Sequence, residues 1–212
     1  IEERFDTNQG ESVTIYVQGP MERDNALQAL VRPNTDPPET LAPGDGNQVQ
    51  TQSIVTVIRD RAERDPEFAA LVERNDRNDD GVPDRNLDLI YDRLFASPAG
   101  DRAEQYLTED RRSAQVVYSV ESDAAQNVVT DESQEHAADF RYTAVATGSI
   151  VVFDAISNII FESAVEGLFL ALFLTGVFLM IAYGVLESKP LLGVVNVFPI
   201  LVSVAALVAT MR

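Results

Sequence analysis

The segment NDRNDDGVPD, residues 75–84, places oxygen-bearing side chains at the spacing of a calcium-binding loop. Ca²⁺ takes about six to eight oxygen ligands, and a glycine at the turn position, here Gly81, permits the bend that lets the ligands converge. Leu87 stands where an EF-hand has its bidentate glutamate, so the segment is not a complete EF-hand. The sequence predicts a weak calcium site here, and a solvated acidic turn is the alternative. The candidate ligands, at positions 1, 3, 5 and 9, are Asp76, Asn78, Asp80 and Asp84.

Other ionisable residues give weaker chemical signals. Glu162 and Glu166 are one helical turn apart at the edge of an apolar run, where a carboxylate is costly unless it is hydrated or paired. We interpret both as acids at a membrane boundary, with ion transport as the alternative. His136, the only histidine, is predicted to be a solvated surface residue. The sequence has no Ser-His-Asp motif, glycine-rich phosphate loop or HExxH motif, so we expect no enzyme and no organic cofactor.

The charge of the chain is confined to its first three quarters. Residues 1–162 carry 14 of the 16 basic and 32 of the 34 acidic residues, which gives 14 − 32 = −18, the whole net charge. Such a surface repels phosphates, which disfavours nucleic acid as a partner. Lys189 is the only lysine, and dense carboxylates are tolerated where salt screens them, so the composition indicates a halophile. An ordinary acidic extracellular domain is the alternative.

Two apolar runs at the C-terminal end predict membrane helices. Gly167–Leu186 is 20 residues without a charge and Pro190–Met211 is 22, and each is about 30 Å long as a helix, close to the thickness of a hydrocarbon core. We therefore predict an α-helical transmembrane hairpin, with helices at 163–186 and 191–211 and a hinge at 187–190. An amphipathic helix at 149–162 is expected to continue into the first span without a break, and it either rises out of the membrane or lies on the membrane surface before turning in.

A row of small residues recurs at every fourth position of the first span. Small residues let two helix backbones approach closely in lipid, so the row predicts packing against a further membrane helix. A lining for a substrate path is the alternative. The row consists of Ser163, Gly167, Ala171 and Thr175.

The acidic region reads as an α+β domain, a sheet with helices on one face. Period-2 alternation predicts strands, and 3.6-residue periodicity predicts helices, with Pro66 splitting one helical stretch in two. No structure is predicted for the proline-rich residues 32–50. The predicted strands are 12–17, 114–120 and 142–146, and the predicted helices are 21–31, 53–74, 87–96 and 124–140.

The segment from Thr147 to Val204 resembles the resistance-nodulation-division (RND) permease superfamily, particularly its MMPL-like and archaeal exporters. The resemblance lies in a strand that ends at the pair Thr147-Gly148 before a helix enters the membrane, a tight hinge at 186–191, and a proline-containing helix at 195–200. It is close over this segment, and it covers the acidic region only in architecture.

The resemblance implies that residues 1–148 are an extracellular porter-like domain of a multi-pass plasma-membrane exporter, with Lys189 on the cytoplasmic side. Such a permease moves hydrophobic or amphiphilic substrates with an ion gradient. Its proton-relay carboxylate belongs to a later helix, so no residue here takes that role, and we expect the chain to be a fragment whose partners are the remaining helices, lipid and substrate. The alternatives are a membrane-anchored binding or sensor domain, which the acidic loop could make calcium-dependent, and a protein-export auxiliary of the SecD/SecF type.

Overall fold

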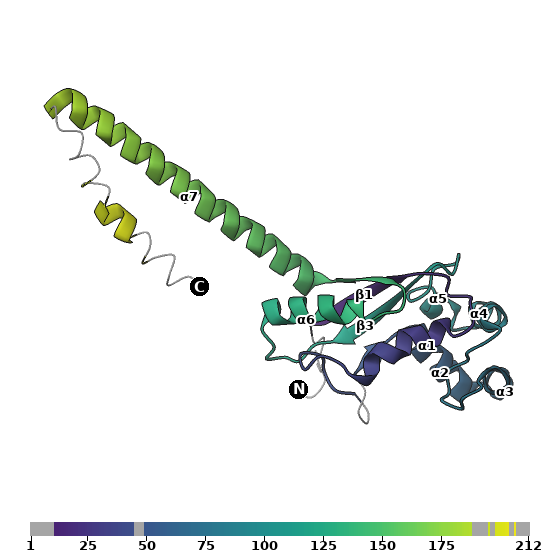
Figure 1. The fold of residues 1–212 in the computed structure, drawn as a ribbon. Helices are drawn as coiled ribbons and strands as arrows, with labels where there is room; N and C mark the ends of the chain where they lie inside the picture. The colour runs from purple at the N-terminus through teal and green to yellow at the C-terminus, as the bar shows by residue number, and fades with distance from the viewer. Residues whose placement is uncertain (1–10, 45–48, 188–194, 196–197, 204–205, 207–212) are drawn as a thin grey trace, which may run out of the picture. The chain divides into compact units, whose positions relative to one another are not determined.

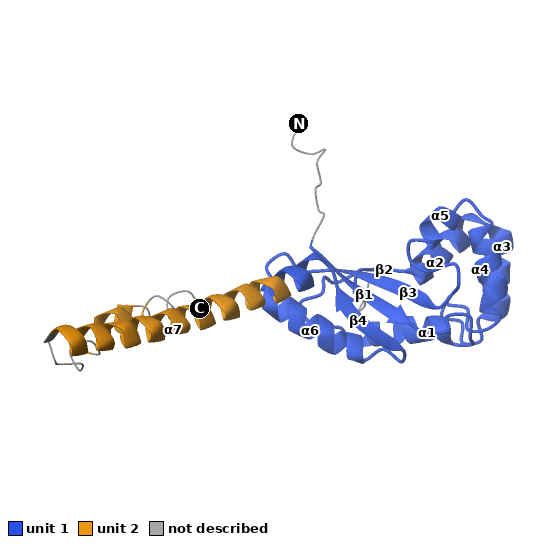
Figure 2. Cartoon of the chain, turned by 90° about the horizontal axis from the view of Figure 1, so that it is seen from above, with its two compact units in different colours: residues 1–154 blue, residues 155–212 orange. Residues whose placement is uncertain are grey.

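The computed structural model describes residues 11–44, 49–187, 195, 198–203 and 206. It divides into two compact units, residues 1–154 and 155–212, which Figure 2 colours separately. Residues 188–190 of the predicted hinge at 187–190 and most of the second apolar run lie outside the described residues.

Unit 1 contains a four-stranded antiparallel sheet, as Figure 1 shows. The strands are β1 (Ser12–Gln18), β2 (Thr51–Gln52), β3 (Ser113–Ser119) and β4 (Thr143–Thr147). Their spatial order is β2-β3-β1-β4, so β1 lies between β3 and β4. Ile15 pairs with Val116 on one side and with Ala146 on the other, which fixes the register of the three longer strands.

One face of the sheet is buried and the other is open. Side chains alternate across a strand, so the register places the apolar residues of all three longer strands on one face. On the opposite face Tyr16 is 43% exposed and Val145 is 58% exposed. The buried face consists of Val13, Ile15, Val17, Ala114, Val116, Tyr118 and Ala146.

Two helices supply the other half of this core, α1 (Ala26–Val31) and α6 (Gln126–Ala138). Helix α1 contributes Leu27 and Leu30, and α6 contributes Val129 and Ala137. The order β1, α1, β2, β3, α6, β4 with sheet order β2-β3-β1-β4 is the split βαβ, or ferredoxin-like, arrangement. The prediction of an α+β fold is confirmed.

Four helices are inserted between β2 and β3, and both views place them beside one end of the sheet. Asp65 ends the first and caps the second by accepting the backbone N–H groups of Glu67 and Phe68, so Pro66 splits the helical stretch as predicted. The buried Tyr91 hydroxyl donates to the Met21 carbonyl at 3.0 Å and ties the insertion to the segment after β1. The four helices are α2 (Ile54–Arg64), α3 (Pro66–Asn75), α4 (Leu87–Phe95) and α5 (Gly100–Ala103).

Three local predictions are corrected. Helix α1 begins at Ala26 rather than residue 21, because Asn25 adopts a left-handed conformation (φ 63°) through which an α-helix does not run. The proline-rich stretch 32–50 contains a 3₁₀ helix, η2 (Arg32–Thr35), although we predicted no structure there. The two-residue β2 and the four-residue α5 have no counterpart among the predicted elements.

Strand β4 leads through Gly148 directly into the long helix α7 (Ser149–Glu187). Gly148 has φ 126°, a region that favours glycine, and a Cβ atom there would lie 3.2 Å from the Ser12 carbonyl oxygen. Ile150 and Val151, in the first turn of α7, are buried in the core of unit 1. The prediction that residues 149–186 form one unbroken helix is confirmed.

In unit 2, α7 is the one described helix that is long and apolar enough to cross a membrane. The whole helix has 39 residues and is therefore about 58 Å long, compared with about 30 Å for a hydrocarbon core. Large apolar side chains along it are exposed, including Phe169 at 63% and Phe173 at 68%. Helix α7 is thus a candidate membrane span that is longer than a hydrocarbon core is thick.

Candidate functional site

The predicted calcium loop connects α3 to α4. Asp76, its first residue, accepts the backbone N–H groups of Asn78 and Asp79 on Oδ1 at 3.2 and 2.9 Å, and that of Gly81 on Oδ2 at 2.7 Å. Asp79 and Gly81 are in the left-handed region, with φ 59° and 77°. The chain therefore wraps tightly around the Asp76 carboxylate.

Asp80 joins this loop to α1. Its Oδ1 accepts the Val82 backbone N–H at 2.9 Å, and its Oδ2 accepts the side-chain amides of Asn78 at 3.0 Å and Gln28 at 2.6 Å. Gln28 belongs to α1, 52 residues earlier in the chain. The Asp80 carboxylate thus connects the helical insertion to a helix of the sheet domain.

Asp84 is the buried acid of the loop, with 4% of its surface exposed. Its Oδ2 accepts the Arg77 backbone N–H at 3.1 Å, and the Arg77 side chain lies 3.6 Å from its Oδ1. The same guanidinium lies 3.6 Å from Asp24. Arg77 is therefore the cation that balances the buried carboxylate.

The acidic loop is held together by N–H donors and by Arg77. Among the residues that the structure describes, no three acidic or histidine side chains come close enough to hold a metal ion. To bind Ca²⁺, the loop carboxylates would have to turn toward a common centre and exchange some of these partners. Calcium binding by Asp76, Asn78, Asp80 and Asp84 stays a prediction.

His136 is buried, and the prediction of a solvated surface residue is wrong. Only 2% of its surface is exposed, and its ring contacts Tyr118 and Phe140 edge-on, with centroid distances of 5.3 and 5.8 Å. Thr130 and Ser133, on the same face of α6, are also buried. Burial lowers the pKa of His136, and Asp139 opposes this only in part. The sequence concealed this face because it is built from small and polar residues.

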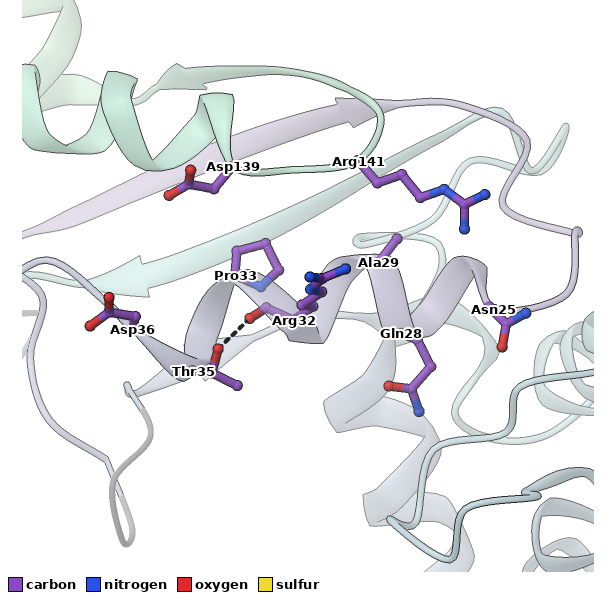
Figure 3. A pocket seen from close by; sticks show the side chains of 9 residues that line it. All are labelled: Asn25, Gln28, Ala29, Arg32, Pro33, Thr35, Asp36, Asp139 and Arg141. Carbon is purple, nitrogen blue, oxygen red and sulfur yellow. Dashed lines mark hydrogen bonds between the residues drawn. The ribbon is translucent and has the colours of Figure 1, made fainter.

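A trough of about 680 Å³ lies between the α1–η2 segment and the turn from α6 to β4 (Figure 3). The buried residues Ala29 and Pro33 also line it. The sequence did not point to this site, because it brings together residues about 110 positions apart. The polar residues that line it are Asn25, Gln28, Arg32, Thr35, Asp36, Asp139 and Arg141.

The row of small residues on α7 is exposed in unit 2. A Cβ atom added at Gly167 would meet nothing within 4 Å, and the Thr175 hydroxyl donates to the Ala171 carbonyl at 2.8 Å, inside its own helix. Glu162 and Glu166 are also exposed. The roles predicted for the row and for the two boundary acids stay predictions.

The described part of the second apolar run contacts a different side of α7. Phe198 and Leu201 line an apolar hollow of about 400 Å³ together with residues of α7. The α7 residues that line this hollow recur at helical spacing. Because successive residues of an α-helix are about 100° apart around its axis, these residues face away from the row of small residues. They are Phe169, Leu172, Phe173, Gly176, Val177 and Met180.

Comparison with known proteins gives no relative: the chain matches no protein-family model, no curated protein and no solved structure.

Proposed function

We propose that this chain belongs to a membrane exporter of the RND/MMPL type, as an extracellular porter-like domain followed by a transmembrane hairpin. The observation that carries the proposal is the junction at Gly148. A ferredoxin-like sheet ends in β4, and β4 passes through Thr147 and Gly148 directly into a 39-residue apolar helix. A strand that ends at this Thr-Gly pair before a membrane helix is what the resemblance to the RND superfamily implies.

The hairpin is supported by the hollow that Phe198 and Leu201 share with α7. The length of α7 also supports a membrane span, because about 20 of its 39 residues suffice to cross the hydrocarbon core. In this proposal the substrate is hydrophobic or amphiphilic and an ion gradient drives export. The carboxylate that carries the coupling ion lies on another helix of the permease.

The topology can be tested with single cysteines, because the native chain has none. An impermeant maleimide applied to intact cells should label Asp101→Cys in α5, and should label Lys189→Cys only after lysis. The cysteine-free chain is the control. Protection of Asp101→Cys in intact cells would place the acidic domain inside and would contradict the proposal.

Transport needs a separate test on the full-length gene product. Reconstituted in liposomes with an imposed ion gradient, it should move a fluorescent amphiphile, and an ionophore should abolish the movement. A membrane-anchored binding domain is the second candidate, and the trough beside α1 favours it because the trough has the size of a ligand site. If the acidic domain is external but no gradient-driven transport is measured, the protein is a membrane-anchored binding domain.

A further inference from the structure

The trough of Figure 3 separates positive from negative charge. Arg141 reaches from the α6–β4 turn toward α1, where the Arg32 guanidinium lies beside Ala29. The carboxylates of Asp36 and Asp139 lie toward the other end in this view. Two cations and two anions thus line one hollow, whereas residues 1–162 as a whole carry a charge of −18.

The two arginines are available to a ligand. Neither Arg32 nor Arg141 forms an ion pair with a carboxylate of the described residues, and both side chains are exposed. Five other described arginines do form such ion pairs, namely Arg61, Arg77, Arg93, Arg102 and Arg111. A guanidinium presents a planar fork of N–H donors that fits carboxylate or phosphate oxygens.

We propose that the trough binds a small zwitterion, with its anionic group between Arg32 and Arg141 and its ammonium group toward Asp36 and Asp139. Its volume of about 680 Å³ is within the range of roughly 300–1,000 Å³ that is usual for small-molecule sites. The buried Ala29 and Pro33 offer the ligand's carbon atoms an apolar contact. The inference does not depend on the proposed transport function.

The arrangement also predicts selectivity. A simple anion is attracted by the two guanidinium groups but repelled by Asp36 and Asp139. A simple amine is attracted by the two carboxylates but repelled by the two arginines. A molecule that carries both an anionic and an ammonium group can pair with the arginines and with the aspartates at once. When one of its groups is bound, the other is held near its partner at a high effective concentration. A zwitterion should therefore bind more tightly than either of its halves.

Titration calorimetry of the full chain in detergent and concentrated KCl can test this with O-phosphoethanolamine, inorganic phosphate and ethanolamine. We expect O-phosphoethanolamine to bind at least about tenfold more tightly than either half. Arg141→Gln should weaken binding of O-phosphoethanolamine and of phosphate about tenfold, the effect of losing one charge-assisted bond. Asp139→Asn should weaken the binding of O-phosphoethanolamine and strengthen the binding of phosphate, because it removes the ammonium partner of the first and a repulsive charge from the second.

Arg64→Gln is the matched control, because Arg64 is exposed, lies outside the trough and forms no ion pair with a described carboxylate. It should bind all three probes as the wild type does, and circular dichroism should show every variant folded.

A short-chain phosphatidylethanolamine, kept below its micelle concentration, distinguishes the source of the ligand. If the phosphatidylethanolamine binds more tightly than O-phosphoethanolamine, the ligand is a lipid headgroup. If it binds equally or more weakly, the ligand is a free solute. Equal affinities in the wild type and both trough variants, or binding of no probe, would overturn the inference.

Discussion

Gly148 shows how a single residue controls the passage from sheet to long helix. Replacing it by alanine should destabilise the protein by about 1–3 kcal/mol, because φ 126° is unfavourable for alanine and the new Cβ would press on the Ser12 carbonyl. Chemical denaturation of the full chain in detergent measures this. Gly167→Ala is the control and should cost nothing, since its Cβ meets no atom within 4 Å. Equal stability of the two variants would show that the junction is unstrained.

The acidic loop predicts weak calcium binding, with a dissociation constant in roughly the millimolar range of extracellular modules. At ten times that concentration, Ca²⁺ should stabilise the fold by about 1.4 kcal/mol. Calorimetry and thermal unfolding in high salt should show this for the wild type and for Asp101→Ala, an exposed acid of α5, but not for Asp80→Ala. Indistinguishable calcium titrations of the wild type and Asp80→Ala would leave a solvated acidic turn.

His136 predicts a pH dependence of stability. Burial lowers its pKa in the folded state below the value of about 6.5 in the unfolded chain. The unfolded state therefore binds more protons, and stability is lost as the pH falls below about 6.5, by at most about 1.4 kcal/mol per pH unit. His136→Phe keeps a ring between Tyr118 and Phe140 and should lose this slope between about pH 7 and pH 5.5. Since His136 is the only histidine, parallel pH profiles would refute the assignment.

At the scale of elements, periodicity predicted the long strands and helices because each carries its own apolar pattern. Strand β2 is only two residues long and owes its place to pairing with Tyr118 and Val117 of β3, so no local pattern could reveal it. The burial of His136 depends on which face of α6 meets the sheet. The trough depends on a contact between segments about 110 residues apart. Such features arise from tertiary packing rather than from local sequence.

The row of small residues on α7 predicts packing against another helix of the full protein. Leucine at Gly167 or Ala171 would force two helix backbones apart, so either change should lower folded yield or transport. Leu170→Phe is the control, because Leu170 is already large and 59% exposed. Phe173 is unsuitable for this purpose, since it lines the hollow shared with Phe198.

Cysteine labelling shows the packed face of α7 directly. A lipid-phase thiol reagent should react with a cysteine at position 170 and much less at 167 and 171. Strong labelling at 167 and 171 with protection at 170 would mean that the row faces lipid. The described part of the second run leaves this row exposed, and we predict that a further helix covers it.

For the whole molecule, the net charge of −18 is the dominant electrostatic fact. The described ion pairs use only some of the acids, and Asp101, Asp123 and Asp131 are exposed and without a described ion pair. Their mutual repulsion favours expanded states in dilute buffer, where the screening length is about 10 Å at 0.1 M salt. At 1 M it falls to about 3 Å.

We therefore predict that unit 1 folds only at high salt. Circular dichroism of the full chain in uncharged detergent should show the β and inserted-helix signals growing along a KCl series, while α7 stays helical throughout. The triple variant Asp101→Asn, Asp123→Asn, Asp131→Asn should move the midpoint to lower salt, because it removes three negative charges without breaking a described ion pair. An uncharged osmolyte should substitute poorly for KCl, since it does not screen charge. A spectrum that is the same in 0.1 M and in 3 M salt would show that the carboxylates repel too weakly to matter, and the acidic composition would then need a reason other than salt adaptation.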